Sequence, residues 1–416
     1  MDFVPVKNFD NEISPKDIVK DAELSFSCCV HKIKKRSGFT FVTLRTGRYT
    51  FLAVHNPKLC EKPLKGVFEG VYISVKCKIR EEIKAENGLE ISIIDYEIIS
   101  KPREKYPLPV SDRIIDCAPE EMIENRPVTF RNPVEKAPAI VLSSVLGGFS
   151  EFMRDNGFVE IKTPAITQIR SESEKNMFSL DYFGQAAYLS ADPGVYTQCA
   201  LAYFDRVFGI CDAFSGKIRN SPRLLNEYIA LHFDMAYVFN TKELMSYMIS
   251  VVEHIIKSVS SECEYALGLL DACVPEVKDV PSICFGDAMK LLNKEDEQKD
   301  LDPTDEKRLC KWAKDNYGSE FVFVTEYHTS KRPVYYKEND AFALLFRGME
   351  IGFGGLKKNE YNGEVYSKAY SDFFRFGMPP NGGVSIGAER FVKQLSGLRD
   401  IRQVSLFPRD IRNVNP

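Results

Sequence analysis

The chain has 416 residues, 44% of them hydrophobic, which is enough for two or three domains with cores of their own and excludes a peptide or a disordered chain. A formal net charge of −4 excludes a protein that is basic along its whole length. The charge is unevenly distributed, because residues 24–80 hold twelve basic and two acidic residues, a net of +10, so the remainder carries −14. We therefore expect one basic module that contacts a polyanion and one acidic module with a different task.

The cysteines and the N-terminus bear on the cellular compartment. Eleven cysteines are scattered through the chain with no C-x-x-C pair, which indicates reduced thiols rather than a disulfide framework or a zinc site. The first residues include acids where a signal peptide would be basic and apolar, and no run of about 18 apolar residues occurs. These features predict a soluble, cytoplasmic protein.

The basic segment reads as a small β-barrel. Five short segments with strand-like alternation, residues 26–33, 39–45, 49–55, 71–79 and 89–99, are separated by turn residues. Five strands in this length predict an OB-type barrel, which binds nucleic acid through basic and aromatic side chains. Such side chains alternate here: Lys34, Lys35, Arg36, Phe39, Phe41, Arg45, Arg48, Tyr49 and Phe51. A charged surface over ordinary core aromatics explains the composition equally well.

The rest of the chain alternates weakly between helix and strand patterns. Residues 101–109 contain three prolines and four charges and mark a linker. We expect a helix over residues 137–156, strands over 158–166, around Tyr188 and Val207 and over 229–239, and helix over 241–269. The predicted domains are an OB-type domain (1–105), a hinge (106–130) and a larger domain (131–416). The predicted fold class is α+β.

Common catalytic signatures such as the P-loop or the G-x-S-x-G elbow are missing. Three segments are informative instead: residues 157–164, residues 206–208 followed by 223–228, and residues 387–390 followed by 405–410. In order and spacing they resemble the three motifs of class II aminoacyl-tRNA synthetases, and specifically aspartyl-tRNA synthetases of the archaeal and eukaryotic cytosolic type. Residues 177–189 and 377–383 are similar to that family as well, so the resemblance covers nearly the whole chain.

The resemblance implies a fold and a reaction. The expected fold is an antiparallel sheet of six or seven strands flanked by helices, preceded by an anticodon-binding OB-type barrel. The expected assembly is a homodimer formed through motif 1 around Pro164. The expected reaction joins aspartate to ATP as an adenylate, releases pyrophosphate and then acylates tRNA, with Mg²⁺ and arginines neutralising phosphate charge.

The resemblance also assigns roles to individual residues. Arg390 matches the motif 3 arginine at the ATP γ-phosphate, and Arg223 matches an arginine of the motif 2 loop. Glu350 matches the catalytic glutamate that binds ATP and metal. Tyr228 stands where the family stacks a phenylalanine on adenine, and Glu172 lies near the position that contacts the aspartate amino group. Gly387 and Leu224 complete the expected ATP-binding set.

Several family positions are changed. Ser215 stands where motif 2 has an arginine that contacts the substrate carboxylate and the α-phosphate, and Thr197 replaces the aspartate-reading lysine. Phe353 and Lys357 fall in the segment that grips the substrate side chain, where Lys357 retains a positive charge. If the strand continues past Ser215, Lys217 points to the same side and restores part of the lost charge. A solvated lysine at the start of a loop is an equally good interpretation.

The anticodon contacts are the last part of the assignment. Phe41 matches a family phenylalanine that reads the anticodon, with Lys34, Lys35, Arg36 and Arg45 around it. Leu52 stands where a polar base reader would be expected. The expected partner is therefore tRNA for aspartate, with tRNA for asparagine left open.

The changed positions leave three functions in competition. The first is an aspartate–tRNA ligase with a divergent active site. The second is a synthetase-like tRNA-binding or dimerising protein that lacks catalysis, as the loss of the motif 2 arginine at Ser215 would suggest. The third is an enzyme that forms an amide from aspartate and ATP without tRNA.

Overall fold

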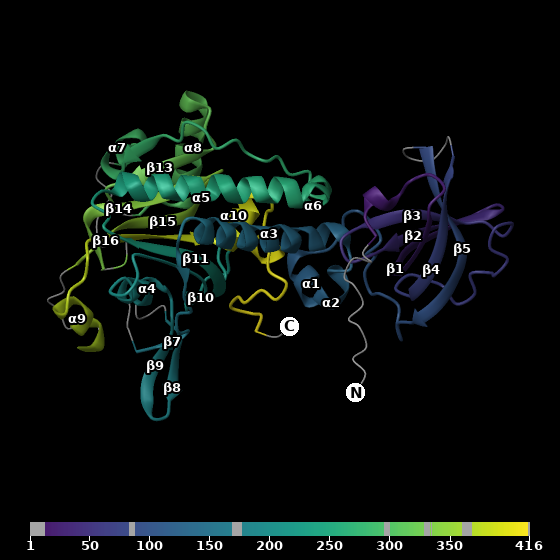
Figure 1. The fold of residues 1–416 in the computed structure, drawn as a ribbon, viewed down its shortest axis with the longest axis horizontal. Helices are drawn as coiled ribbons and strands as arrows, with labels where there is room; N and C mark the ends of the chain where they lie inside the picture. Colours follow the sequence, from purple (N-terminus) through teal and green to yellow (C-terminus); the bar gives the residue numbers. More distant parts are fainter. Residues whose placement is uncertain are drawn as a thin grey trace. The chain divides into compact units, whose positions relative to one another are not determined.

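The computed structural model describes residues 13–82, 88–168, 177–294, 300–327, 333, 335–359 and 368–414. The chain divides into two compact units, Met1–Lys136 and Ala137–Pro416 (Figure 1). No helix of the described residues is long and apolar enough to cross a bilayer.

The first unit is built on a closed five-stranded barrel with the strand order β1-β2-β3-β5-β4. Inward side chains such as Val42, Leu44, Ile73 and Val75 are almost completely buried and alternate with more exposed ones, as the sequence pattern predicted. The OB-type barrel is thus confirmed. Its strands are β1 (Glu23–Arg36), β2 (Phe39–Arg45), β3 (Thr50–His55), β4 (Tyr72–Glu81) and β5 (Leu89–Ser100).

Short helices follow the barrel. A single 3₁₀ turn, η2 (Pro15–Asp17), precedes it, while α1 (Pro119–Glu124) and α2 (Arg126–Thr129) lie in the segment predicted as a hinge. Helix α3 (Pro133–Asp155) then begins and continues into the second unit, four residues earlier than predicted. The assignment of residues 106–130 as a hinge stays a prediction.

The second unit contains an eight-stranded sheet in the order β12-β13-β14-β15-β16-β11-β10-β6. The six central strands are antiparallel neighbours, while the short edge strands β12 and β6 each pair in parallel. The six antiparallel strands agree with the expected six or seven, and the two short parallel edge strands bring the total to eight. The strands are β6 (Val159–Glu160), β10 (Arg206–Phe214), β11 (Glu227–Ala236), β12 (Ser282–Cys284), β13 (Phe321–Thr325), β14 (Tyr336–Phe346), β15 (Met349–Lys357) and β16 (Asn381–Gly387).

Helices cover the two faces of this sheet unequally. The long helices α3 and α5 (Thr241–Glu262) bury one face, where Phe233, Val384 and Phe342 join the main hydrophobic core (Figure 1). On the opposite face, α7 (Phe285–Leu291) packs on β12 and β13, and α8 (Pro303–Tyr317) packs on β13, β14 and β15. Helix α4 (Gly194–Ala200) lies over β10 and β11. The part of this face on β16 lies between α8 and α4, where a site can form.

A β-bulge in β15 decides which side chains reach that face. Leu344 pairs with Gly352 while Leu345 pairs with Glu350, so Ile351 is one extra residue in the strand. Ile351 packs into the main core on the α5 side. Because side chains alternate along a strand, the extra residue brings Glu350 to the same face as Phe353 and Lys357.

The remaining elements correct two expectations. Residues 158–166 were predicted as one strand, but only Val159–Glu160 pairs with the sheet, since Pro164 has no N–H to donate. The helical segment over 241–269 is two helices, with a break at Cys263 between α5 and α6. The other elements are α6 (Glu264–Leu269), α9 (Lys368–Arg375), α10 (Ala388–Leu395), the 3₁₀ turn η6 (Ile401–Gln403) and a small sheet of β7 (Ile166–Thr167), β9 (Gln185–Leu189) and β8 (Ser179–Tyr182).

Candidate active site

Two arginines that are far apart in the sequence are both held at the start of β15, where Glu350 lies. Arg390 lies in the first turn of α10, and its Nη1 donates to the backbone oxygen of Glu350 at 3.1 Å. The same nitrogen lies 3.8 Å from the Oε1 atom of Glu350, and the Arg390 side chain is 38% exposed. An exposed guanidinium held beside a carboxylate can bind a phosphate group in solution.

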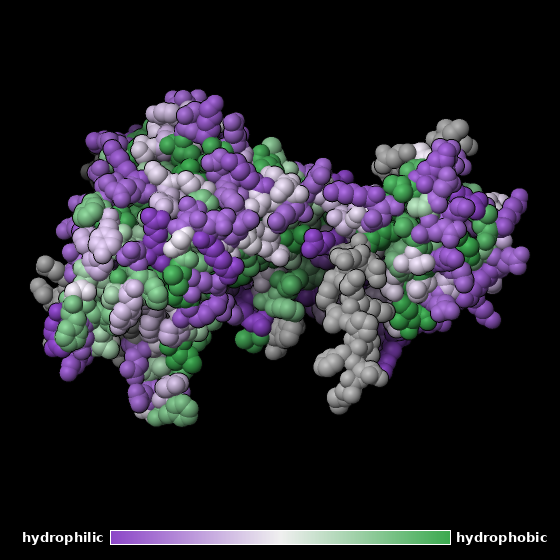
Figure 2. Space-filling view, viewed as in Figure 1, coloured by the Kyte–Doolittle hydropathy of each residue, from purple (hydrophilic) through white to green (hydrophobic). Residues whose placement is uncertain are grey.

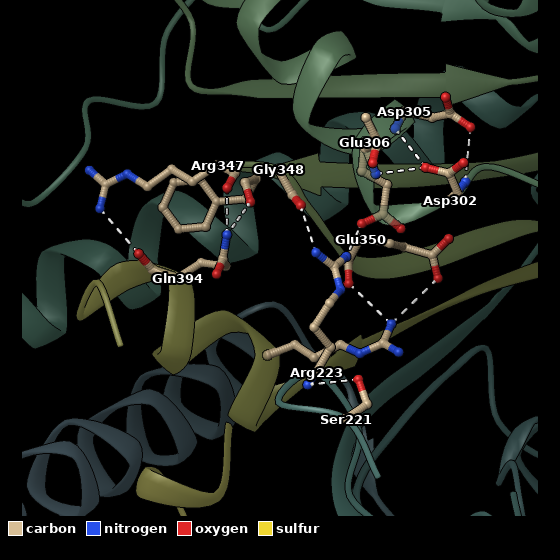
Figure 3. A network of polar contacts seen from close by, with 12 residues as sticks. Ser221, Arg223, Asp302, Asp305, Glu306, Arg347, Gly348, Glu350 and Gln394 are labelled. Atoms are coloured by element: carbon tan, nitrogen blue, oxygen red, sulfur yellow. Dashed lines mark hydrogen bonds and ion pairs between the residues drawn. The ribbon is translucent and has the colours of Figure 1, made fainter. Parts of the chain in front are cut away.

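Arg223 belongs to the loop between β10 and β11 and points toward the same place (Figure 3). Its Nη1 donates to the backbone oxygen of Gly348 at 3.0 Å, and its Nη2 pairs with the Glu306 carboxylate. Gly348 lies in the turn that joins β14 to β15, and Glu306 lies in the first turn of α8. The arginine is therefore held by two elements of the sheet and helix framework.

Glu306 is enclosed among these charges. Burial, together with the nearby charge of Glu350, raises the pKa of its carboxyl to about 7, although Arg223 and Arg390 act in the opposite direction. Both partners of the Arg223–Glu306 pair are mostly buried, with side chains 23% and 12% exposed. An ion pair that is protected from solvent in this way is screened little by salt.

Tyr228 and Glu389 lie near Arg390. The Tyr228 hydroxyl donates to the backbone oxygen of Ala191 at 3.3 Å, and burial raises its pKa to about 12. The Glu389 carboxylate accepts the Ile229 amide at 3.1 and 3.0 Å, and burial raises its pKa to about 7. The Tyr228 ring is half-buried, so one part of it can contact a ligand.

The loop after β10 does not extend the strand. Strand β10 ends at Phe214, so the expectation that Ser215 and Lys217 share one side of a strand is wrong. The Ser215 amide donates to the Asn226 oxygen at 2.8 Å, and Asn226 Nδ2 donates back to the oxygen of Lys217 at 3.2 Å. The Lys217 side chain is exposed. The structure thus holds the backbone of this loop but does not fix the Lys217 ammonium at the site.

Lys357 is engaged within a buried cluster. Its Nζ lies 2.6 Å from Oδ2 of Asp234, donates to the backbone oxygen of Gly194 at 2.8 Å and sits 4.8 Å from the centre of the Tyr335 ring. Burial alone would raise the pKa of Asp234, but Lys357 and His232 hold it at about 2. Lys357 and Asp234 are both 0% exposed. The lysine charge is therefore balanced within the protein.

Glycines make room for this cluster. A Cβ atom on Gly383 would lie 1.5 Å from Oδ1 of Asp234, and one on Gly194 would lie 2.4 Å from the Tyr335 hydroxyl. The hydroxyl of Tyr335 donates to the Asp192 carboxylate, which also accepts the Gly194 amide at 2.8 Å. These contacts enclose the Lys357–Asp234 cluster on the side that faces α4.

The other predicted aspartate-binding residues lie around this cluster. Thr197 is fully buried in α4 and donates to the backbone oxygen of Pro193 at 3.4 Å. Phe353 is half-buried on β15, with its ring at the edge of Tyr336. Glu172 lies outside the described residues. Leu224 is half-buried in the same loop as Arg223, and Gly387 is the N-cap of α10.

The predicted tRNA contacts line two neighbouring barrel strands. Lys34 pairs with Phe41 and Arg36 pairs with Phe39 across β1 and β2, so these four side chains share the outer surface. The rings of Phe39 and Phe41 meet edge to face at 5.1 Å. Lys34, Lys35 and Arg36 are exposed, whereas Arg45 is half-buried. Half-exposed aromatic rings beside exposed cations are suited to stacking on bases and pairing with phosphates.

Glu350 is the residue that could hold a divalent metal. Its sheet neighbours on the same face are Leu345 and Phe353, which offer no oxygen ligand. Among the described residues, no group of three or more His, Cys, Asp or Glu side chains could hold a metal ion. Mg²⁺ is commonly bound by one or two carboxylates together with substrate phosphates. The donor set therefore fits Mg²⁺ that arrives with a nucleotide, but not a resident ion in a protein cage.

Three important residues were missed by reading the sequence. His232 and Asp234 alternate on one face of an otherwise apolar strand, and this polar pair in a buried strand was a usable signal. Glu306 had no such signal, because the first turn of α8 is rich in acids as many helices are. Its role emerges only from its contact with Arg223.

Comparisons with known proteins agree with this geometry. The family model of class II tRNA synthetases (D, K and N) matches residues 118–411. An aspartate–tRNA(Asp/Asn) ligase of Deinococcus radiodurans is 32% identical over 83% of this chain and 86% of the relative. An aspartate–tRNA(Asp) ligase of Pyrococcus horikoshii is 28% identical over 98% and 99%.

Solved structures share the fold. An asparaginyl-tRNA synthetase from Pyrococcus horikoshii, complexed with asparaginyl-adenylate, superposes with a TM-score of 0.86 at 20% identity, covering 99% of this chain and 100% of that one. An aspartyl-tRNA synthetase from Entamoeba histolytica gives 0.83 at 20% identity, covering 97% and 92%.

Proposed function

Because the chain belongs to the class II tRNA synthetases of the D, K and N group, we propose that it is an aspartate–tRNA ligase. The observation that carries the proposal is that Arg223 and Arg390 are both held at the start of β15, where Glu350 lies. The names of the aspartate–tRNA ligase relatives identify aspartate as the proposed amino acid substrate.

The proposed reaction has two steps. A carboxylate oxygen of aspartate attacks the α-phosphorus of ATP, and the bond to pyrophosphate breaks. A hydroxyl of the terminal tRNA adenosine then attacks the aspartyl carbonyl, and AMP leaves. Neither step requires a strong protein acid or base, so the protein acts mainly through positioning and charge.

The described residues divide this work. Arg390 and Arg223 bind the β- and γ-phosphates and stabilise the negative charge that pyrophosphate gains, and Tyr228 contacts the adenine ring. Leu224 and Gly387 line the nucleotide site. Glu350 would hold Mg²⁺, which supplies further neutralisation of phosphate charge when it is bound.

The test is ATP–pyrophosphate exchange measured with aspartate, with asparagine and with no amino acid. Exchange that depends on aspartate supports the proposal, and Arg390→Ala should abolish it. Asparagine formation from aspartate, ATP and ammonia without tRNA would instead support an amide-forming enzyme. No exchange with any amino acid, in folded protein, would contradict the ligase.

A second candidate is a synthetase-like tRNA-binding protein without catalysis. The observation that favours it is the enclosure of Lys357, whose charge is balanced by Asp234 and covered by Tyr335, so that this lysine is not free to pair with a substrate carboxylate. This candidate predicts tRNA binding with no stabilisation by ATP. A clear rise in melting temperature on adding ATP would contradict it.

The proposal extends to partners. The barrel surface with Lys34, Arg36 and Phe41 is proposed to bind the anticodon of tRNA for aspartate, and binding of tRNA for asparagine is the comparison to make.

We further propose a homodimer formed around Pro164. The nearby β8–β9 hairpin supports it, because its tip carries Phe183 at 88% exposure and appears hydrophobic in Figure 2.

The proposal also places the protein in the cytoplasm. All eleven cysteines are free thiols, as expected in a reducing compartment. Fractionation of the cells that make the protein would test this placement.

A further inference from the structure

The structure assigns a positioning role to Glu306: we propose that its carboxylate holds Arg223 in the orientation that receives ATP. This inference rests on the proposed function, because it concerns the nucleotide site of the same enzyme. It adds a residue of α8, far from the three motifs in the sequence, to the machinery that binds ATP.

The need for such a residue follows from where Arg223 sits. Its loop spans residues 215–226 between two strands and has no regular secondary structure apart from a turn. A long side chain on an irregular loop samples many rotamers, and fixing it in one of them costs side-chain entropy. Unless another residue fixes the guanidinium beforehand, ATP binding must bear that cost.

Glu306 can fix the Arg223 guanidinium, because Glu306 lies in a helix turn that other contacts hold in place. Asp302 caps α8 by accepting the amides of Thr304 and Asp305 at 2.7 and 3.1 Å. Asp305, with a side chain 2% exposed, pairs with Lys294 at 2.9 Å. The first turn of α8 is therefore anchored at the residues that immediately precede Glu306 (Figure 3).

The pair leaves Arg223 able to bind a ligand. A guanidinium has five N–H donors, and the contacts with Glu306 and the Gly348 oxygen use two of them. The side chain keeps 23% of its surface exposed. Arg223 can therefore donate to a phosphate while both protein contacts are kept. A carboxylate that merely competed with ATP for Arg223 would give the opposite effect when removed.

The chain offers a matched control in Glu320. Its carboxylate pairs with Arg347 at 3.1 Å (Nε) and 2.7 Å (Nη2), with side chains 23% and 22% exposed, so the pair is of the same kind. Arg347 is also held by the backbone oxygens of Cys273, Gln394 and Leu395. Loss of Glu320 should therefore leave the turn at Gly348 in place.

The experiment is calorimetric titration of the full-length protein with Mg–ATP, and separately with aspartate. We expect Glu306→Gln to weaken ATP binding about 5- to 30-fold, as a loss of 1–2 kcal/mol predicts, and to leave aspartate binding unchanged. Glu320→Gln should lower the melting temperature similarly without changing ATP affinity. In the double variant with Arg223→Ala, Glu306→Gln should have no further effect, because it acts through that arginine.

Three results would overturn the inference. They are ATP affinity in Glu306→Gln equal to or tighter than in the wild type, additive effects in the double variant, and no ATP binding by the wild type. A wild type that binds ATP but shows no aspartate-dependent exchange would contradict the proposed function while the test of Glu306 still stands.

Discussion

Glu389 is a buried acid whose proton matters near neutral pH. Its carboxyl is 4% exposed and its pKa is raised to about 7 by burial. The folded protein therefore holds this proton more tightly than the unfolded chain, whose pKa is about 4.5. The associated stability is fully present below pH 4.5 and is lost as the pH rises toward 7.

The Glu389→Gln variant should lack this pH dependence. Between pH 5 and pH 8, the free energy of unfolding of the wild type should fall by about 2 kcal/mol more than that of the variant, because the amide does not ionise. Urea denaturation at the two pH values measures the difference. The control is Glu253→Gln on the surface of α5, where Glu253 pairs with Lys257 in the adjacent turn. Parallel pH profiles for Glu389→Gln and the wild type would contradict the prediction.

The sequence predicts some residues of the site and leaves out others. Arg223, Arg390 and Glu350 were picked from motif spacing, and the structure brings all three together, although their roles stay predictions. Glu306 could not be found because a contact with a distant loop leaves no trace in local sequence. The expected compensation by Lys217 failed because β10 ends at Phe214, so the strand alternation on which it depended does not reach Lys217.

Strand β16 shows how an element without large side chains can control a site. Gly383 lies opposite Asp234, and any Cβ there would overlap the carboxylate that balances Lys357. We predict that Gly383→Ala destabilises the fold by about 3–5 kcal/mol, because it separates a buried ion pair. Chemical denaturation measures this.

The matched control for that variant is Gly268→Ala in α6, where a Cβ would meet no atom within 4 Å. That change should be neutral or stabilising by about 0.5–1 kcal/mol, since alanine favours helix over glycine. Equal effects of the two substitutions would contradict the packing argument.

The elements themselves were predicted to different degrees. The five barrel strands alternate clearly between core and solvent, and all five were placed correctly. The edge strands β6 and β12 were missed or overextended because two or three paired residues produce no periodicity. Pairing with a neighbour, rather than local pattern, determines such short strands.

For the molecule as a whole, positive charge is concentrated in one part of the first unit. Residues 24–80 of the barrel carry a net of +10, the rest of the first unit carries −8, and the second unit carries −6. Replacing Lys34, Lys35 and Arg36 by glutamine should reduce the slope of log K for tRNA against log salt concentration by about 2–3, because three phosphate contacts are lost.

The measurement is tRNA binding over a range of salt concentrations. As a control, the same three replacements at Lys242, Lys257 and Lys311, which are exposed on helices of the second unit, should change the slope little. A slope that is unaltered by the barrel variant would show that this surface does not bind tRNA.

The extra residue in β15 is the one whose loss the site could tolerate. Substitution of Ile351 changes packing against the core, whereas its deletion would restore a regular ladder. Glu350 would stay opposite Leu345 and keep its face, because Ile351 is the residue without a cross-strand partner. The catalytic unit should therefore accept other apolar side chains at position 351, and a β15 shortened by this residue should still present Glu350 to the site.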